Sequence, residues 1–245
     1  MDLTSLNDND TNQSIRHLCH QTVSEAGEVA AVCVYPEFIL AAKQALKVLG
    51  ADDINVATVT NFPHGLAYMD IALRETSLAV GAGADEVDLV FPYKAWLNGN
   101  KEIGSKMVAE CKKICEGQAK LKVIIETGIL KEPEIIREVS VACIRAGADF
   151  IKTSTGKVDV NATLEAAEVM LTAIRDENAQ ETCGFKAAGG VRTPQEASQY
   201  INLARSILGD DWVCPSNFRF GASSLLGGLL GYLGLKVDDT QKSGY

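Results

Sequence analysis

Two lysines stand inside apolar, strand-like segments of the sequence. Lys152 lies between Ile151 and Thr153, and Lys186 follows Phe185 in a second segment of the same kind. Lysine has a low strand propensity, and burying its charge is costly. Such a lysine is paired with a carboxylate, or is kept neutral as a nucleophile, or extends its amine to water at the strand end.

The occurrence of two such lysines narrows these alternatives. Adjacent parallel strands lie about 4.8 Å apart, so two inward-facing lysines at matching depth become close neighbours. Two cations in one pocket lower each other's pKa, which leaves one amine neutral near neutral pH. A neutral amine is what a Schiff-base lysine requires.

A carboxylate occupies a third apolar segment. Asp88 stands between Val87 and Leu89. It can serve as the counter-ion of the lysines and as a proton shuttle beside an imine, and the two roles are compatible. Glu126 ends another such segment, and we interpret it as a structural partner.

Three turns rich in glycine, serine or threonine follow strand-like segments and favour a phosphate site. Glycines let backbone N–H groups approach an anion, and a helix N-terminus favours negative charge. The same residue types also fill ordinary tight turns. Arg192 either adds charge to this site or pairs with a helix residue. The candidate phosphate-binding residues are Thr155, Gly156, Lys157, Gly189, Gly190, Gly221, Ser223 and Ser224.

Eight short, mostly β-branched segments must position these residues, and helix-like stretches alternate with them. This alternation predicts parallel βαβ units, in either a closed eight-stranded barrel or an open doubly wound sheet. The strand count favours the barrel, and no glycine-rich dinucleotide turn follows the first strand. The expected strands are 2–6, 30–34, 55–60, 86–91, 122–127, 149–153, 182–187 and 218–222. The clearest expected helices are 36–49, 71–82, 103–115, 133–146, 164–175 and 194–208.

An internal echo also favours the barrel. The sequence AGADEVDLV at 82–90 is similar to AGADFIKTS at 146–154, and the two lie 64 residues apart, the length of two βα units. We therefore predict an α/β fold of the (β/α)8 TIM-barrel type. A single domain is expected over residues 1–237, followed by a polar, mobile C-terminal tail over residues 238–245.

Composition excludes several classes of function. The formal charge of −9 argues against a broad basic face for nucleic acid. The uncharged run 220–235 is short for a membrane span of about 20 residues. The seven cysteines form no CxxC pattern and predict reduced, buried thiols. We expect a cytoplasmic protein that binds no metal, nucleic acid or membrane.

The sequence resembles the bacterial form of deoxyribose-phosphate aldolase along its whole length. The segments that carry the resemblance are MDLTSLN, VCVYP, ATVTNFPHG, GADEVDLVFPY, KVIIETG, GADFIKTSTGK, GFKAAGGVRT and RFGASSLL. The resemblance implies that Lys152 is the Schiff-base lysine, Lys186 the second active-site lysine and Asp88 the proton-relay aspartate. It also implies phosphate contacts at the glycines, serines and Lys157 named above. The positions that line the substrate pocket are then Thr4, Leu6, Cys33 and Thr155.

The sequence departs from close bacterial relatives at two points. Ala187 stands where such relatives often carry a proline, a change that should barely affect the chemistry. Such relatives carry a helix before MDLT that this sequence does not show. We expect this difference to affect the closure of the barrel floor and the stability more than the active site. The last residue, Tyr245, matches a tyrosine thought to reach the active site, and we take it as a candidate helper in proton transfer. If Cys33 faces the pocket, excess aldehyde would modify it.

The implied activity is that of a class I aldolase. It would cleave 2-deoxy-D-ribose 5-phosphate reversibly to D-glyceraldehyde 3-phosphate and acetaldehyde, without metal or organic cofactor, in deoxyribonucleotide and carbohydrate degradation. The alternatives are another lysine-dependent aldolase that acts on a phosphorylated keto-sugar, or a non-catalytic barrel that binds a sugar phosphate. The expected partners are small phosphorylated sugars and aldehydes, and a homodimer is left open.

Overall fold

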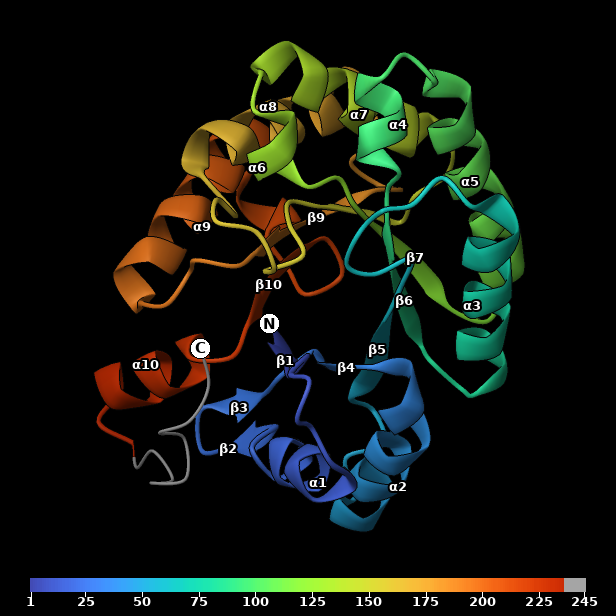
Figure 1. The fold of residues 1–245 in the computed structure, drawn as a ribbon. Coiled ribbons are helices and arrows are strands. Elements are labelled where there is room, and N and C mark those ends of the chain that lie inside the picture. Colours follow the sequence, from blue (N-terminus) through green and yellow to red (C-terminus); the bar gives the residue numbers. More distant parts are fainter. Residues whose placement is uncertain (236–245) are drawn as a thin grey trace.

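A closed barrel of parallel strands forms the centre of the molecule (Figure 1). The computed structural model describes residues 1–235. The strands follow the order β1-β10-β9-β8-β7-β6-β5-β4 around the barrel, so the predicted TIM-barrel fold is confirmed. They are β1 (Asp2–Thr4), β4 (Ala31–Val34), β5 (Asn55–Thr60), β6 (Glu86–Val90), β7 (Lys120–Ile124), β8 (Phe150–Lys152), β9 (Gly184–Ala188) and β10 (Phe218–Ala222).

Helices surround the barrel and connect its strands (Figure 1). The longer ones are α1 (Asn12–His20), α2 (Ile39–Leu49), α3 (Met69–Gly81), α5 (Lys101–Cys115), α7 (Pro133–Arg145), α8 (Leu164–Asp176), α9 (Pro194–Leu208) and α10 (Leu225–Tyr232). Short helices α4 (Tyr93–Leu97) and α6 (Thr127–Leu130) follow β6 and β7. Two 3₁₀ turns, η1 (Pro36–Phe38) and η2 (Asp210–Trp212), precede α2 and β10. No helix of the described chain is long and apolar enough to cross a membrane.

Local sequence signals set several helix ends. Thr193 caps α9 by accepting the N–H of Glu196, whose side chain binds back to the cap, and Pro194 occupies the first turn. Helix α2 ends at Gly50, whose φ of 67° suits a residue without a side chain. The proline-started segment at 36–49 forms η1 before α2, rather than one continuous helix.

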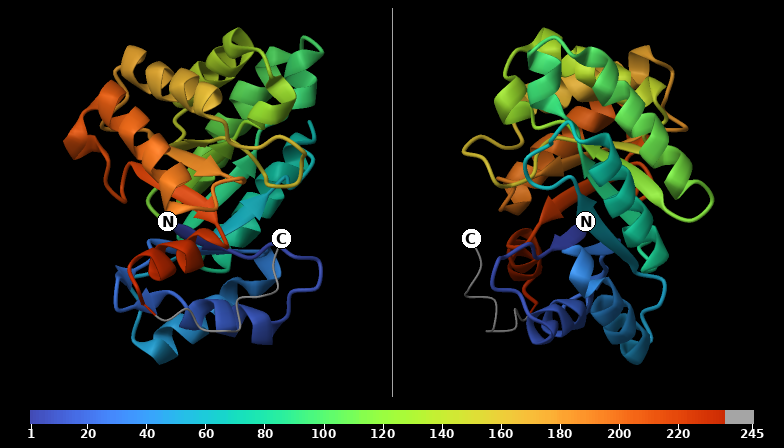
Figure 2. Two further views of the ribbon diagram at one scale, coloured as in Figure 1. Left: turned by 90° about the vertical axis from the view of Figure 1, so that its left-hand side faces the viewer. Right: turned by 45° about the vertical axis from the view of Figure 1, so that its right-hand side comes forward.

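The N-terminal and C-terminal parts of the chain lie together at one end of the molecule. The antiparallel pair β2 (Val23–Ser24) and β3 (Gly27–Glu28) stands apart from the barrel sheet. Helix α10 lies beside this pair in each view (Figures 1 and 2). The predicted tail, with Tyr245, lies outside the described residues.

The aspartates of the two AGAD motifs, Asp85 and Asp149, make the same set of interactions, which we call the AGAD brace. Asp85 accepts the N–H of Val56 at 2.6 Å and the amine of Lys43 at 2.6 Å. Asp149 accepts the N–H of Leu121 at 2.7 Å and the amine of Lys112 at 2.6 Å. In each case the aspartate just before a strand ties down the preceding strand and a helix lysine. The internal echo therefore reflects a structural repeat.

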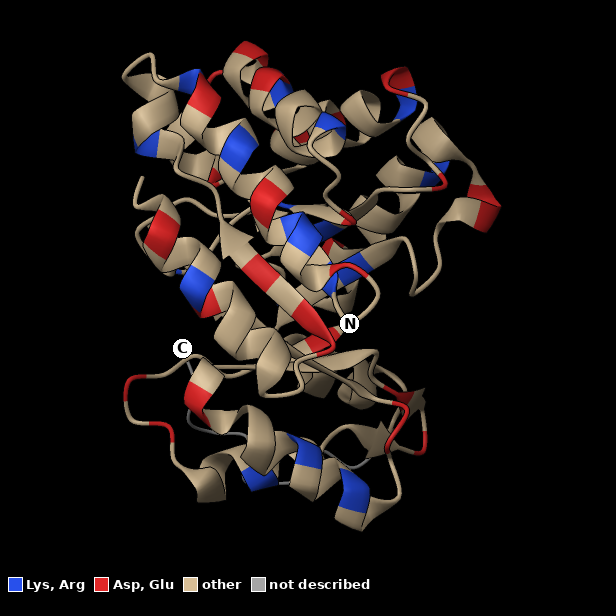
Figure 3. Ribbon diagram, turned by 90° about the vertical axis from the view of Figure 1, so that its right-hand side faces the viewer, with Lys and Arg blue, Asp and Glu red and all other residues tan. Residues whose placement is uncertain are grey.

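Alternation along the strands divides the buried residues into two layers. Val32, Val56, Leu89 and Ile151 belong to the large apolar cluster that includes helix residues. A second, smaller cluster consists of Leu6, Ala31, Cys33, Ala57 and Val59, from β4, β5 and the segment after β1. Along the helices, Lys and Arg are interspersed with Asp and Glu (Figure 3).

Candidate active site

Lys152, Lys186 and Asp88 meet inside the barrel. Lys152 and Lys186 are register partners on β8 and β9. The amine of Lys152 lies 2.7 Å from Asp88 Oδ2, and that of Lys186 lies 2.8 Å from the same oxygen. Lys152 is 3% exposed and the other two are fully buried, so this carboxylate is shared by two amines away from bulk water.

A third lysine, to which we assigned no role from the sequence, completes the surroundings of Asp88. Lys122 on β7 lies 2.7 Å from Asp88 Oδ1 and 2.6 Å from Glu86 Oε2. Asp88 and Lys122 are register partners on neighbouring strands. The signal was present in the sequence, because Lys122 interrupts an apolar strand in the same way as Lys152 does.

Further ion pairs extend this cluster to Asp2, Glu86 and Arg219. Lys186 Nζ is 2.5 Å from Asp2 Oδ2, and Arg219 Nη1 is 2.6 Å from Asp2 Oδ1. Arg219 Nη2 also reaches Glu86 Oε1 at 3.2 Å. Burying these charges is tolerable because each is paired. The network holds one more basic than acidic side chain, which favours a neutral amine at one site. Its basic members are Lys122, Lys152, Lys186 and Arg219, and its acidic members are Asp2, Glu86 and Asp88.

The lysines of this network differ in their electrostatics. Burial, assisted by the charge of Lys186, lowers the pKa of Lys152 despite the attraction of Asp88. Burial also opposes the charge of Lys186, but Asp2 and Asp88 outweigh it and raise the pKa of Lys186. For Asp88, burial is outweighed by the surrounding lysines, and its pKa lies well below the usual range. Lys152 is therefore the amine that loses its proton most readily.

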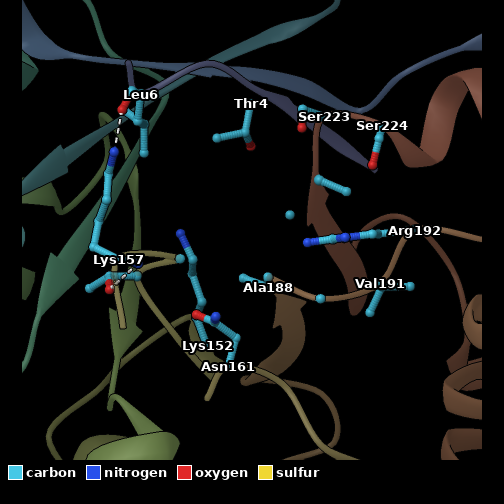
Figure 4. A pocket seen from close by; sticks show the side chains of 16 residues that line it. Thr4, Leu6, Lys152, Lys157, Asn161, Ala188, Val191, Arg192, Ser223 and Ser224 are labelled. Atoms are coloured by element: carbon cyan, nitrogen blue, oxygen red, sulfur yellow. Dashed lines mark hydrogen bonds between the residues drawn. The ribbon is translucent and has the colours of Figure 1, made fainter. Parts of the chain in front are cut away.

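A pocket of about 340 Å³ opens above Lys152, whose amine points into it (Figure 4). Ten residues predicted for binding line this pocket, and Asn161, Ala188, Val191, Arg192 and Ala222 join them. Cys33 is fully buried and lies outside this lining, and burial raises the pKa of its thiol. The ten are Thr4, Leu6, Thr155, Gly156, Lys157, Gly189, Gly190, Gly221, Ser223 and Ser224.

One side of the pocket is suited to an anion. The guanidinium of Arg192 extends into it, with the hydroxyls of Ser223 and Ser224 nearby (Figure 4). The backbone N–H groups of Gly190, Ser223 and Ser224 donate no hydrogen bond within the described chain. Unsatisfied N–H groups beside the start of α10 are typical of phosphate sites. The Lys157 amine donates to the carbonyl of Leu6 at 2.7 Å.

Two glycines of this wall leave little room for a side chain. Gly189 has a φ of 76°, and a Cβ there would lie 2.8 Å from atoms of Asn161. A Cβ at Gly221 would lie 3.0 Å from Cε of Lys186. The glycines thus allow the backbone to approach both the pocket and the amines. Among residues 1–235, no three His, Cys, Asp or Glu side chains are grouped to hold a metal ion.

Comparison with known proteins agrees with this geometry. The structure is similar to that of a candidate deoxyribose-phosphate aldolase from Toxoplasma gondii ME49, with a TM-score of 0.85 and 26% identity over 96% of this chain and 92% of that one. A candidate deoxyribose-phosphate aldolase from Coccidioides immitis gives a TM-score of 0.75 at 28% identity, over 92% and 82% of the two chains. A deoxyribose phosphate aldolase from Aeropyrum pernix, with a tetrameric structure, shares the fold at a TM-score of 0.75 and 22% identity, over 95% and 88%.

The match to a protein family covers almost the whole described chain. Residues 1–229 match the DeoC/LacD family of aldolases. This range includes all eight barrel strands and the residues that line the pocket. The chain therefore belongs to the DeoC/LacD family and is an aldolase, a lyase that acts on carbon–carbon bonds.

Proposed function

We propose that this aldolase cleaves 2-deoxy-D-ribose 5-phosphate reversibly to D-glyceraldehyde 3-phosphate and acetaldehyde through a Schiff base on Lys152. The observation that carries the proposal is the position of Lys152. Its amine, with a lowered pKa, faces a pocket whose opposite wall carries anion-binding groups. The names of the solved relatives support the choice of substrate.

The bond-making steps follow from the state of Lys152. Its neutral amine attacks the C1 aldehyde to form a carbinolamine, which loses water to give a protonated imine. The imine withdraws the electron pair of the C2–C3 bond as the C3 hydroxyl passes its proton to a water molecule. Glyceraldehyde 3-phosphate leaves, and the enamine that remains gains a proton at C2. Water then adds to the imine and releases acetaldehyde.

Asp88 and Lys186 stabilise and move charge during these steps. Asp88 already lies 2.7 Å from the nitrogen that becomes the cationic imine, so its charge is in place before the reaction begins. Lys186 is protonated before the reaction and shares the same carboxylate oxygen at 2.8 Å. It can pass a proton to the carbinolamine through a water molecule, as a general acid.

The phosphate of the substrate would bind between the turn at Gly156 and Lys157 and the wall formed by Gly190, Ser223, Ser224 and Arg192, all of which line the pocket. These N–H, hydroxyl and guanidinium groups provide donors for a dianion. Binding at this wall, remote from the reacting carbons, fixes the aldehyde over Lys152.

Trapping with borohydride tests the proposal. The protein is incubated with 2-deoxyribose 5-phosphate or acetaldehyde, reduced and mapped by mass spectrometry, with Lys152→Met as the matched control. We expect an irreversible adduct on the Lys152 peptide and none in the control. An adduct on Lys186 would exchange the two lysine roles. No adduct despite substrate binding would overturn the Schiff-base mechanism. Cleavage of ketose phosphates but not of 2-deoxyribose 5-phosphate would overturn the proposed substrate and favour an aldolase that acts on a phosphorylated keto-sugar.

We also propose that the protein works in the cytoplasm, in the degradation of deoxyribonucleotides, as a homodimer. All seven cysteines are free thiols, and six of them are buried, as a reducing compartment permits. Leu40 and Val48 of α2 and Ile71 and Leu78 of α3 expose half or more of their surface. A second copy of the chain would cover these apolar faces, and the tetramer of the Aeropyrum pernix aldolase gives a precedent for assembly. Sedimentation of wild type and Val48→Asp distinguishes a dimer from a monomer.

A further inference from the structure

Glu126 is a buried carboxylate that the proposed mechanism does not use. It follows β7 and is fully buried. Its backbone has a φ of 58° and a ψ of 62°, in the left-handed region that side chains other than glycine rarely adopt. This conformation ends the strand at Ile124, whereas the sequence predicted a strand up to residue 127. Strained backbone of this kind clusters at functional sites.

The carboxylate of Glu126 binds one residue of the pocket twice. The hydroxyl of Thr155 donates to Glu126 Oε2 at 2.6 Å. The N–H of Thr155 donates to Glu126 Oε1 at 3.3 Å. Thr155 lines the pocket in the turn that follows β8. Both of its donors are thus committed to Glu126 across the gap between two strands.

The orientation of the Thr155 hydroxyl has a second effect. Because its proton points to Glu126, its lone pairs accept the N–H of Lys157 at 3.1 Å. This bond folds the turn around Gly156, whose φ is 83°. A chain of hydrogen bonds therefore runs from Glu126 through Thr155 to the backbone of Lys157, and it shapes one wall of the pocket.

We propose that Glu126 is a positioning residue that holds the turn 155–157 in the shape that receives the substrate phosphate. It acts through Thr155, and it neither touches the substrate nor moves its protons. Thr155, predicted above as a direct phosphate contact, instead serves as the link in this chain because its donors are already occupied. The inference deepens the proposed function and rests on its phosphate site.

Two substrates that differ only in the phosphate test this role. Glu126→Gln keeps the size of the side chain, but it presents an NH₂ group to one of the two Thr155 donors. We expect its KM for 2-deoxyribose 5-phosphate to rise about tenfold, since one hydrogen bond to a charged group is lost. Its kcat, and its kcat/KM for unphosphorylated 2-deoxyribose, should stay within about twofold. The inhibition constant of inorganic phosphate should rise by the same factor as KM.

A double-mutant cycle with Thr155→Val adds a readout that a general loss of stability would not produce. If both residues act through one bond, the double variant raises KM no more than the larger single change does. Glu126→Asp serves as the conservative variant if Glu126→Gln folds poorly. Asp149→Asn is the matched control, because this carboxylate also binds a backbone N–H but lies away from the pocket. It should leave the ratio between the two substrates unchanged.

Each outcome separates this inference from the proposed function. Equal losses for both substrates in Glu126→Gln, or additive effects in the cycle, would overturn the positioning role. A wild-type protein that does not cleave 2-deoxyribose 5-phosphate would overturn the proposed function. In that case a direct binding titration of wild type and Glu126→Gln with inorganic phosphate, which needs no activity, still tests the role of Glu126.

Discussion

The two halves of the barrel interior differ in chemistry. On β4 and β5 the interior holds Ala31, Cys33, Ala57 and Val59, all small and apolar. From β6 through β10 to β1 it holds charged side chains linked by ion pairs, with Asp88 at their centre. The named side chains of both groups are almost fully buried, so burial alone does not distinguish them. The difference shows that the reactive groups come from a continuous run of neighbouring strands.

The pairing in the charged half explains how it is stable. An isolated buried charge costs several kcal/mol, and it is tolerated only where partners and hydrogen bonds replace water. Asp88 meets three lysines, and Asp2 meets Lys186 and Arg219. The apolar half needs no such compensation. It gains stability from the packing of its apolar side chains, which carry no charge that could compete for the ion pairs.

Lys152→Met, a change in the charged half, is expected to have the largest effect on activity. It removes the nucleophile, so kcat should fall by about 10³-fold or more. Asp88 keeps Lys122 and Lys186 as partners, so the protein should stay folded. Steady-state kinetics and circular dichroism measure both. Retained activity would move the chemistry away from Lys152.

Lys122→Met should lower the stability of the folded protein, because it removes a cation from the charged half. The change leaves Glu86 and Asp88 each without one ion-pair partner. We expect a loss of about 3–5 kcal/mol in the free energy of unfolding, measured by urea denaturation. Lys101→Met is the control, because its pair with Glu138 is about half exposed and should contribute about 0–1 kcal/mol. Equal losses in both variants would contradict the account.

The pH dependence of activity sharpens the difference between the lysines. Only neutral Lys152 is nucleophilic, so kcat/KM should fall as the pH drops through its lowered pKa. Replacing Lys186 by Met removes a repelling charge and leaves Asp88 more available to Lys152. Both effects raise the pKa of Lys152, so the acid limb of the profile should move to higher pH. An unmoved limb would show that the profile reports another group.

Acid should weaken the charged half first. The pKa values of Asp2 and Asp88 are lowered from a usual value of 3.8, chiefly by the buried cations that outweigh desolvation. A carboxylate with a lowered pKa in the folded state stabilises the protein above its unfolded pKa. That contribution should be lost as the pH falls below about 3.8. Unfolding curves from pH 6 to pH 2 measure it, and Asp88→Asn should reduce the loss.

The smallest effect is expected in the apolar half. Cys33→Ala removes one buried sulfur and should cost about 1 kcal/mol. Activity should stay within about twofold, since Cys33 lies outside the pocket lining. Burial also raises the pKa of this thiol, so alkylation should be slow in the native protein. Fast loss of activity with excess aldehyde in wild type, absent in the variant, would show that Cys33 is accessible.

Much of this arrangement could be predicted from the sequence. Segments 55–60 and 218–222 match β5 and β10, because β-branched and apolar runs bounded by turns determine strands locally. The meeting of Lys152 and Lys186 followed from their matching depth on neighbouring parallel strands, and Asp88 was expected as their counter-ion. Strand ends were less predictable. The segment 122–127 ends early, because the backbone of Glu126 adopts a left-handed conformation that its residue type does not indicate.

The sequence by itself determined the period of strands and helices, the repeated AGAD brace, and which residues could carry a nucleophilic amine and an anion. Local propensity and alternation suffice for these, since each depends on neighbours along the chain. Only the tertiary structure decided which lysine is shifted toward neutrality and what Glu126 holds. Lys186 binds Asp2, which is 184 residues away in sequence, and the negative charge of Asp2 keeps the Lys186 amine protonated. Lys152 has no contact with Asp2 of this kind. A pKa depends on every charge nearby in space, and only the closed barrel brings those charges together.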